Sequence, residues 1–144
     1  MPVVYWAGPL FNDAERAFNE RAKVALEQLG ITVWLPQDVP LYLNNPGWQQ
    51  VVFDGNVQHI RDADVVCAVV DGCLVDDGTA WEIGYAFAIG KPVIGVYTDI
   101  RSVGIEGTVN LMIGQTCGQL LGADWNAIAD AIREATKCPT RPSS

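Results

Sequence analysis

Three carboxylates, Asp76, Asp77 and Glu82, lie in or beside one short, acidic, glycine-containing loop. The loop follows an apolar run, residues 64–70, that predicts a buried strand, and it leads into a predicted helix that begins near Thr79. Open α/β sheets bind their ligands at the carboxyl ends of strands. Because the positive end of a helix dipole favours a carboxylate in the first turn, we expect Glu82 to be ionised and able to act as a nucleophile.

A purely structural interpretation fits the same residues. The stretch Thr79-Ala-Trp-Glu82 matches a capping box, in which the glutamate side chain bonds back to the cap residue. Asp76 and Asp77 also belong to the residue types that commonly form turns before a helix. Spacing alone therefore leaves capping and catalysis as alternatives.

The composition indicates one folded domain over residues 1–144. Of the 144 residues 49% are hydrophobic, which is enough to bury a substantial core and too many for a disordered protein. Residues 138–144 are expected to form a frayed tail, as chain ends commonly do.

The charge balance argues against a polyanionic partner. The formal net charge is −8, and no run of Lys or Arg offers a track for phosphates. Because such a surface repels nucleic-acid backbones and anionic membranes, we expect neither as a partner. An uncharged nucleoside is a more compatible ligand than a nucleotide.

Neither the cysteines nor the histidine indicates a metal site. The four cysteines include no C-x-x-C pair, and His59, the one histidine, has no neighbouring ligands at metal spacing. Cys67 lies within an apolar run, where it fits as a small core residue. The N-terminus enters a predicted strand at once, and no apolar run is long enough to span a membrane, so we expect a cytoplasmic protein with reduced thiols.

Apolar runs alternate with amphipathic segments along the chain. The runs predict strands at residues 2–7, 31–35, 64–70 and 92–97, and the amphipathic segments predict helices at residues 12–29, 50–61, 79–89 and 124–137. Asn12 and Glu15 form a capping-box pattern at the start of the first helix. This alternation indicates an α/β fold, namely a doubly wound, flavodoxin-like three-layer sandwich with a mainly parallel sheet of about five strands.

Two predicted loops follow strands at the ligand-binding edge of that sheet. Residues 8–11 follow the first strand but lack a G-x-G-x-x-G fingerprint, so a dinucleotide is not indicated. Residues 36–50 form a loop longer than a usual α/β connection, and its aromatic residues could stack on a planar ligand or cover the edge of the core. Core packing is likewise an alternative role for Tyr5 and Phe11.

Four stretches of the chain carry a specific pattern in a fixed order. They are the first strand with its loop, residues 4–11, the end of the second helix, residues 60–64, the block D-D-G-T-A-W-E-I-G-Y-A, residues 76–86, and N-L-M, residues 110–112. Together they resemble the nucleoside 2-deoxyribosyltransferase family over roughly residues 3–115. The D-D-G-T-A-W-E-I-G-Y-A block is the most specific of the four.

The resemblance implies an enzyme of nucleotide salvage that exchanges the base of a 2′-deoxyribonucleoside by double displacement, without a metal or organic cofactor. Glu82 matches the nucleophile that attacks the anomeric carbon, and Tyr5 matches the tyrosine that orients it. Asp76 matches the aspartate that holds the deoxyribose. Asn110 matches an asparagine that a neighbouring subunit supplies to the sugar hydroxyl, which implies a homodimer or a multimer of dimers. The other implied partners are deoxyribonucleosides and free nucleobases.

The resemblance also implies which residues hold the base and how the sugar reacts. The loop that begins at Gly8, together with Phe11 and Gln37, falls where family members hold the base. Cleavage of an N-glycosidic bond builds positive charge on the sugar, which a close carboxylate such as Glu82 stabilises and traps covalently. If water then replaces the acceptor base, the enzyme becomes a hydrolase.

One residue departs from the family's pattern. Family members carry an aspartate, proposed to protonate the leaving base, where this chain has Asn56. Asparagine can hydrogen-bond a base but cannot supply a proton, so the proton would come from Asp76, from Asp54 or Asp77 nearby, or from water. Solvent exposure without a role is the alternative for Asp54 and Asn56.

Two other functions compete with base exchange. A deoxynucleoside 5′-phosphate N-glycosidase of the same superfamily would carry a serine- and glycine-rich first loop and a serine in place of Asn110, neither of which is present, although Arg101 could reach a phosphate. A non-catalytic nucleoside-binding module on the same fold would have no need of Glu82.

Overall fold

The computed structural model describes residues 1–40, 44–100 and 109–137. Within these ranges one sheet contains five strands, and every neighbouring pair is parallel. In sheet order they are β2 (Thr32–Trp34), β1 (Val3–Ala7), β3 (Val65–Val69), β4 (Val93–Val96) and β5 (Leu120–Leu121). The predicted α/β fold with about five strands is confirmed, whereas residues 41–43 of the long predicted loop, Arg101 and the expected tail at residues 138–144 lie outside the described residues.

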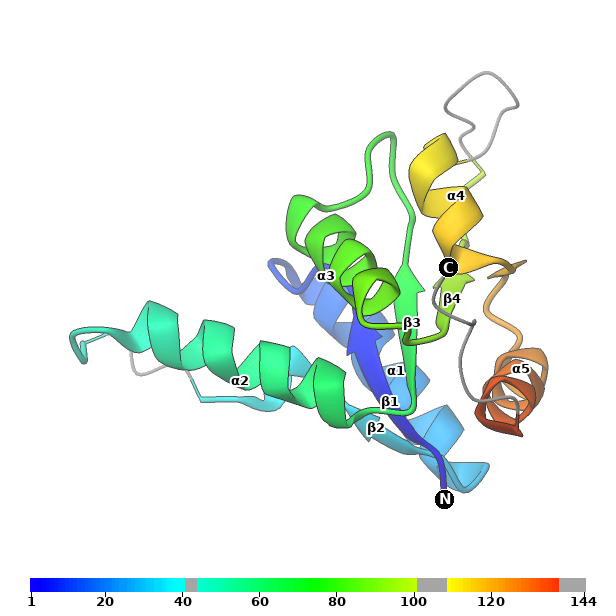
Figure 1. Cartoon of the computed structure of the whole chain (residues 1–144), viewed down its shortest axis with the longest axis horizontal. Coiled ribbons are helices and arrows are strands. Elements are labelled where there is room, and N and C mark those ends of the chain that lie inside the picture. Colours follow the sequence, from blue (N-terminus) through cyan, green and yellow to red (C-terminus); the bar gives the residue numbers. More distant parts are fainter. Residues whose placement is uncertain (41–43, 101–108, 138–144) are drawn as a thin grey trace.

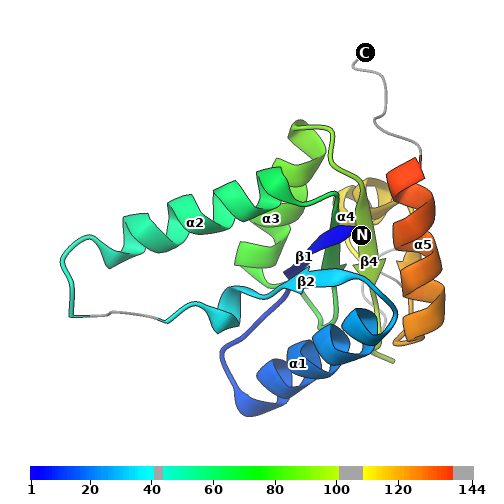
Figure 2. The same cartoon turned by 90° about the horizontal axis from the view of Figure 1, so that it is seen from below.

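Helices cover both faces of the sheet (Figures 1 and 2). The α-helices of the described ranges are α1 (Asp13–Gln28), α2 (Trp48–Asp62), α3 (Asp77–Ala88), α4 (Leu111–Cys117) and α5 (Trp125–Lys137). Successive residues of a strand point to opposite faces. Accordingly Trp6 of β1 is buried with Leu26 of α1, and Tyr5 is buried with Ile83 of α3 on the other face. None of these helices has the length and apolar composition needed to cross a bilayer.

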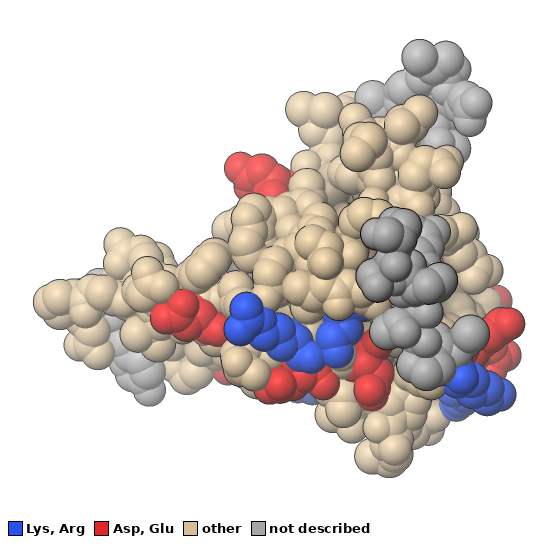
Figure 3. All heavy atoms as spheres, in the orientation of Figure 1, with Lys and Arg blue, Asp and Glu red and all other residues tan. Residues whose placement is uncertain are grey.

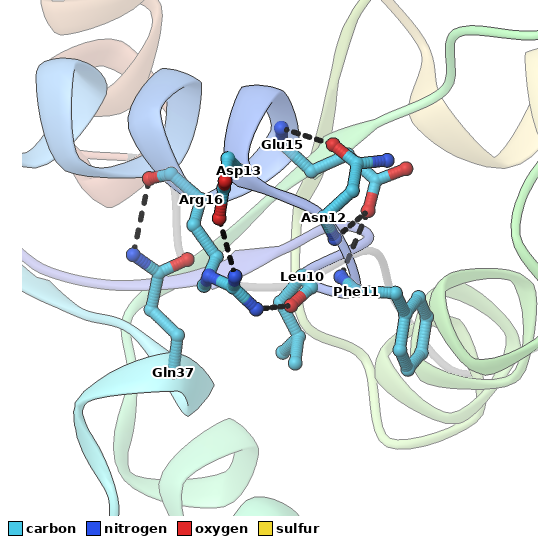
Figure 4. Close-up of polar contacts among 7 residues, drawn as sticks. All are labelled: Leu10, Phe11, Asn12, Asp13, Glu15, Arg16 and Gln37. Atoms are coloured by element: carbon cyan, nitrogen blue, oxygen red, sulfur yellow. Dashed lines mark hydrogen bonds and ion pairs between the residues drawn. The ribbon is translucent and has the colours of Figure 1, made fainter.

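The first helix begins as its sequence predicts. Asn12 Oδ1 accepts a hydrogen bond from the backbone N–H of Glu15 at 3.0 Å, and the Glu15 carboxylate accepts from the N–H of Asn12 at 3.2 Å (Figure 4). The same carboxylate accepts from the N–H of Phe11 at 2.8 Å. This capping box satisfies backbone donors that would otherwise lack partners, and it holds the loop between β1 and α1 against the helix.

Three short elements were not predicted from the sequence. The long loop after β2 contains the 3-10 helix η1 (Pro36–Asp38), and α2 begins at Trp48 rather than at residue 50. Helix α4 has 7 residues and strand β5 has 2. Such segments contain too few residues to show a hydrophobic period, and α4 and β5 are recognised only from their packing against β4.

The N-terminal part of α2 reaches beyond the sheet, as both views show (Figures 1 and 2). On this part Val51 is 73% exposed and Phe53 is 50% exposed. The C-terminal part packs on the sheet, where Ile60 is fully buried. Residues of α2 and α3 line one cavity together.

Candidate active site

Glu82 and Tyr5 form the centre of the site, although they lie 77 residues apart in the chain. The Tyr5 hydroxyl donates a hydrogen bond to Oε1 of Glu82. Tyr5 is fully buried on the face of β1 that α3 covers. Since a buried phenol hydroxyl requires a partner, the fold sets the orientation of the carboxylate through β1.

Burial governs the protonation of this pair. Burial raises the pKa of Glu82 to about 7, the nearby charge of Asp76 acts in the same direction, and the hydrogen bond from Tyr5 opposes both. Burial and the Glu82 charge also raise the pKa of Tyr5, so the phenol remains a proton donor. Burial thus opposes the helix dipole that we expected to favour the ionised form of Glu82, because desolvation favours the neutral carboxyl.

Asp76, rather than Thr79, caps helix α3. Its Oδ2 accepts from the backbone N–H of Thr79 at 2.9 Å and from the Thr79 hydroxyl at 3.0 Å. The helix therefore starts at Asp77, and Glu82 lies in its second turn, too far along to bond back to a cap. The helix begins two residues before the predicted Thr79, and the capping-box alternative for Glu82 is wrong, because Asp76, three residues before Thr79, caps the helix instead.

A cavity of about 260 Å³ opens beside the nucleophile candidate. Its lining comes from α2 and from α3: Phe53, Asn56, Val57, Gly78, Trp81 and Glu82. The rings of Phe53 and Trp81 meet edge to face across it, with centroids 5.5 Å apart. Asn56 therefore lines the same cavity as Glu82, whereas sequence reasoning had left solvent exposure as its alternative.

A second cavity of about 320 Å³ lies on the other side of Asn56. It is bounded by α2, the end of β2 and the segment between them, and its lining is mainly apolar: Trp34, Val39, Pro40, Asn45, Pro46, Trp48, Val51, Val52, Gly55, Asn56 and His59. Asn56 is the residue that the two linings share.

The residues predicted to hold the base lie around the carboxyl end of β1 but outside the two linings. A Cβ on Gly8 would lie 3.1 Å from Cγ2 of Val69, so this glycine permits a close approach between the loop and β3. Phe11 is 73% exposed. Gln37 turns its amide to α1, where its Nε2 donates to the backbone oxygen of Arg16 at 3.1 Å (Figure 4).

The remaining predicted residues lie on the surface. Asp54 accepts from Gln50 at 2.8 Å within α2, and Asp77 accepts from the N–H of Gly78 at 2.8 Å. Asn110 caps α4, since its Oδ1 accepts from the N–H of Met112 at 2.9 Å. None of the three lines either cavity. Within the described ranges no three His, Cys, Asp or Glu side chains gather as a metal site would require.

Sequence reasoning missed two aromatic residues beside the site. Trp81 precedes Glu82 in the chain and lines its cavity, a position that the D-D-G-T-A-W-E block itself could have indicated. Trp34 reaches Tyr5 only through the pairing of β1 with β2, which no local pattern in the sequence encodes.

Comparison with known proteins decides the family. The family model described as nucleoside 2-deoxyribosyltransferase matches residues 4–123. The chain belongs to this family. The match includes Tyr5, Glu82 and Asn110, and it confirms the resemblance that the sequence motifs indicate.

Individual relatives agree with this assignment. A nucleoside deoxyribosyltransferase of Lactobacillus johnsonii is 30% identical over 95 residues, which cover 62% of this chain and 64%, less than two thirds, of that relative's length. The 2-deoxyribosyltransferase of Bacillus psychrosaccharolyticus has a solved structure that is 27% identical, with a TM-score of 0.74 and 99% coverage of both chains. A CMP N-glycosidase of Clostridium botulinum shares the fold, at 20% identity, a TM-score of 0.58 and coverage of 92% of this chain and 98% of its own.

Proposed function

We propose that this protein exchanges the base of 2′-deoxyribonucleosides through a covalent deoxyribosyl intermediate on Glu82. One observation carries the proposal: a largely buried glutamate, oriented by the hydroxyl of Tyr5, lines a cavity between α2 and α3. Membership of the nucleoside 2-deoxyribosyltransferase family supports the same reaction.

The first half-reaction forms an ester. The Glu82 carboxylate attacks the anomeric carbon while the bond from that carbon to the base nitrogen breaks, and the bonding electrons leave with the base. The buried carboxylate stabilises the positive charge that develops on the sugar. Tyr5 keeps one carboxylate oxygen engaged, which leaves the other oxygen for the attack.

The second half-reaction regenerates the carboxylate. A nitrogen of the acceptor base attacks the same carbon and gives its proton to the group that protonated the leaving base, and the ester oxygen departs as Glu82 regains its charge. Two inversions at one carbon give net retention of configuration. Water in place of the acceptor base would give hydrolysis instead, so the ratio of exchange to hydrolysis depends on which of the two occupies the cavity.

The leaving base requires a proton or a hydrogen bond from the site. Asn56 lines the Glu82 cavity and can donate a hydrogen bond through its amide N–H, but an amide is too weak an acid to transfer a proton to the base. Asp76 is a further carboxyl group whose charge acts on the pKa of Glu82, and within the described residues its Oδ1 makes no hydrogen bond. We assign base orientation to Asn56, and proton transfer to Asp76 or to a water molecule that it holds.

Self-association belongs to the same proposal. Asn110 is exposed at the start of α4, and the two residues after it, Leu111 and Met112, are 73% and 72% exposed. An exposed pair of large apolar side chains beside a candidate sugar ligand suits a contact with a second copy of this chain. In an isologous dimer each subunit would supply Asn110 to its neighbour's site.

The decisive experiment is a base-exchange assay. The protein is incubated with deoxyinosine and adenine, and separately with deoxyinosine monophosphate, and the bases and nucleosides are followed by chromatography. We expect deoxyadenosine from the first mixture and no base release from the second. Release of hypoxanthine from the monophosphate would support the N-glycosidase instead, and binding without turnover would support a non-catalytic module.

A variant pair tests the nucleophile. Glu82→Ala should lower exchange by about 10³-fold or more, since the covalent intermediate cannot form. The matched control is Glu20→Ala, which removes an exposed glutamate from α1 and should leave exchange unchanged. Substantial exchange by folded Glu82→Ala protein would exclude the assignment.

A further inference from the structure

We propose that Trp34 is a positioning residue, which holds Tyr5 in the orientation that presents its hydroxyl to Glu82. The inference rests on the function proposed above, because it assigns Trp34 a part in that reaction. It stands on the contacts of three aromatic rings that come from β1, β2 and α2.

Strand pairing brings the first two rings together. Tyr5 of β1 and Trp34 of β2 are direct partners in the parallel register, so their side chains project from the same face of the sheet. Their rings are stacked, with centroids 5.1 Å apart and planes inclined by 23°. The Tyr5 ring therefore has a flat neighbour along one side, which limits its rotation.

The third ring, that of His59, stacks on the side of Trp34 away from Tyr5. His59 of α2 stacks on Trp34, with centroids 4.0 Å apart and planes inclined by 21°. Trp34 and His59 also line the cavity of about 320 Å³, whereas Tyr5 does not. The indole thus separates the buried phenol from the larger cavity, and loss of the indole would give the Tyr5 ring space to turn.

The position of the Tyr5 ring matters because, among the residues that the structure describes, its hydroxyl has one hydrogen-bond partner. Oε1 of Glu82 accepts its hydrogen bond, and the remaining restraints on the ring are packing contacts. A hydrogen bond weakens steeply when its angle departs from linearity, so a small rotation of the phenol would weaken this contact. Trp34 therefore acts on Glu82 through Tyr5, without touching the carboxylate itself.

A double-mutant cycle tests this route. Trp34→Leu should lower kcat/KM for base exchange by about tenfold in the wild-type background, which corresponds to about 1.4 kcal/mol. In the Tyr5→Phe background, where the hydroxyl is already absent, Trp34→Leu should change kcat/KM by less than about twofold. Trp34→Phe, which keeps a flat ring against Tyr5, should restore most of the activity.

The chain offers a matched control on the opposite face of the sheet. Trp125 of α5 is also a partly buried tryptophan in an aromatic cluster, with its ring centroid 6.5 Å from that of Trp6. Trp125→Leu should lower thermal stability about as much as Trp34→Leu while leaving kcat/KM unchanged. His59→Ala, at an exposed position, should fold normally and lower kcat/KM by about twofold.

A second readout does not depend on turnover. The titration midpoint of the Glu82 carboxyl carbon, followed by NMR without substrate, should move in Trp34→Leu but not in Trp125→Leu. In the Tyr5→Phe background, Trp34→Leu should leave the titration midpoint of Glu82 unchanged. Equal effects of Trp34→Leu with and without the Tyr5 hydroxyl, in activity or in titration, would overturn the inference. A wild-type protein that exchanges no base would instead contradict the proposed function, and the titration would still test the positioning.

Discussion

At the scale of single residues, the site depends on a carboxylate kept in a poorly solvated place. Burial raises the pKa of Glu82 to about 7, and the hydroxyl of Tyr5 limits that rise. A carboxylate near its pKa at neutral pH is still ionised in a substantial fraction of molecules, and desolvation makes the ionised form a stronger nucleophile. The same burial that prepares the chemistry should cost stability.

This cost gives a prediction for Glu82→Gln. A carboxyl whose pKa in the folded state lies above its unfolded value contributes stability that is complete below the unfolded pKa of about 4.5 and is lost as pH rises through about 7. The rise in the pKa of Glu82 corresponds to about 2–3 kcal/mol of unfolding free energy lost at high pH, after an allowance for partial exposure to solvent. Glutamine cannot ionise and can still accept from Tyr5, so Glu82→Gln should be more stable than wild type at pH 8.5.

Chemical denaturation at several pH values measures this difference. At pH 4 the two proteins should unfold at similar denaturant concentrations, and the difference should open as the pH rises from about 4.5 to about 7. A constant gap across that range would mean that Glu82 does not titrate with a raised pKa in the folded protein.

At the scale of elements, the start of α3 has a structural task and, in the proposed function, a chemical task as well. Asp76 caps the helix through Oδ2, and its charge raises the pKa of Glu82 further along the same helix. The cap fixes the first turn of α3 and thereby the place of Glu82 relative to β1. The cap that spacing alone allows at Thr79 and Glu82 is thus formed by Asp76, which leaves the Glu82 carboxylate free for the proposed reaction.

Two substitutions at Asp76 should separate these tasks. Asp76→Asn retains a side-chain oxygen for the N–H of Thr79, so its stability should stay within about 0.5 kcal/mol of wild type, whereas Asp76→Ala should lose about 0.5–2 kcal/mol. Both variants remove the charge and should lose exchange activity to a similar extent. Thermal melts and the deoxyinosine–adenine assay measure the two effects, and full activity in folded Asp76→Asn would leave Asp76 with capping alone.

At the scale of the whole molecule, charge and apolar surface are unevenly distributed. Figure 3 shows a face over α3 and α4 on which charged atoms are sparse, while Lys, Arg, Asp and Glu gather along its lower margin. Large apolar side chains are exposed on these helices, including Trp81 at 47%, Phe87 at 52% and Leu111 at 73%. Such a surface suits burial against a second subunit, which agrees with a shared site completed by Asn110.

Subunit exchange tests the shared site. Glu82→Ala and Asn110→Ala should each be inactive as pure proteins, and mixing them should restore activity, because each mixed dimer holds one site with both wild-type residues. Independent sites predict about half the wild-type activity per mixed dimer. Circular dichroism should first show that Asn110→Ala is folded, because it also loses the cap of α4, at about 1 kcal/mol. No recovery after verified exchange, or a fully active monomer in light scattering, would reject the shared site.

The sequence by itself determined the order of the elements and the neighbourhood of the chemistry. Continuous apolar runs identify β1, β3 and β4 as buried strands, and the acidic block locates Glu82 on a helix that leaves the carboxyl end of β3. These are properties of short segments, whose periodicity and turn residues can be recognised without the rest of the chain. The family motifs depend on the same local information.

Only the tertiary structure decided how those parts act on one another. The hydrogen bond between Tyr5 and Glu82, the stack of Trp34 on Tyr5 and the place of Asn56 beside the Glu82 cavity all join segments that are distant in the chain. The raised pKa of Glu82 follows from burial, which is the sum of contacts from several elements rather than a property of any one of them. Residue types and spacing can therefore identify the candidate carboxylate, but its pKa depends on the burial that only the assembled fold produces.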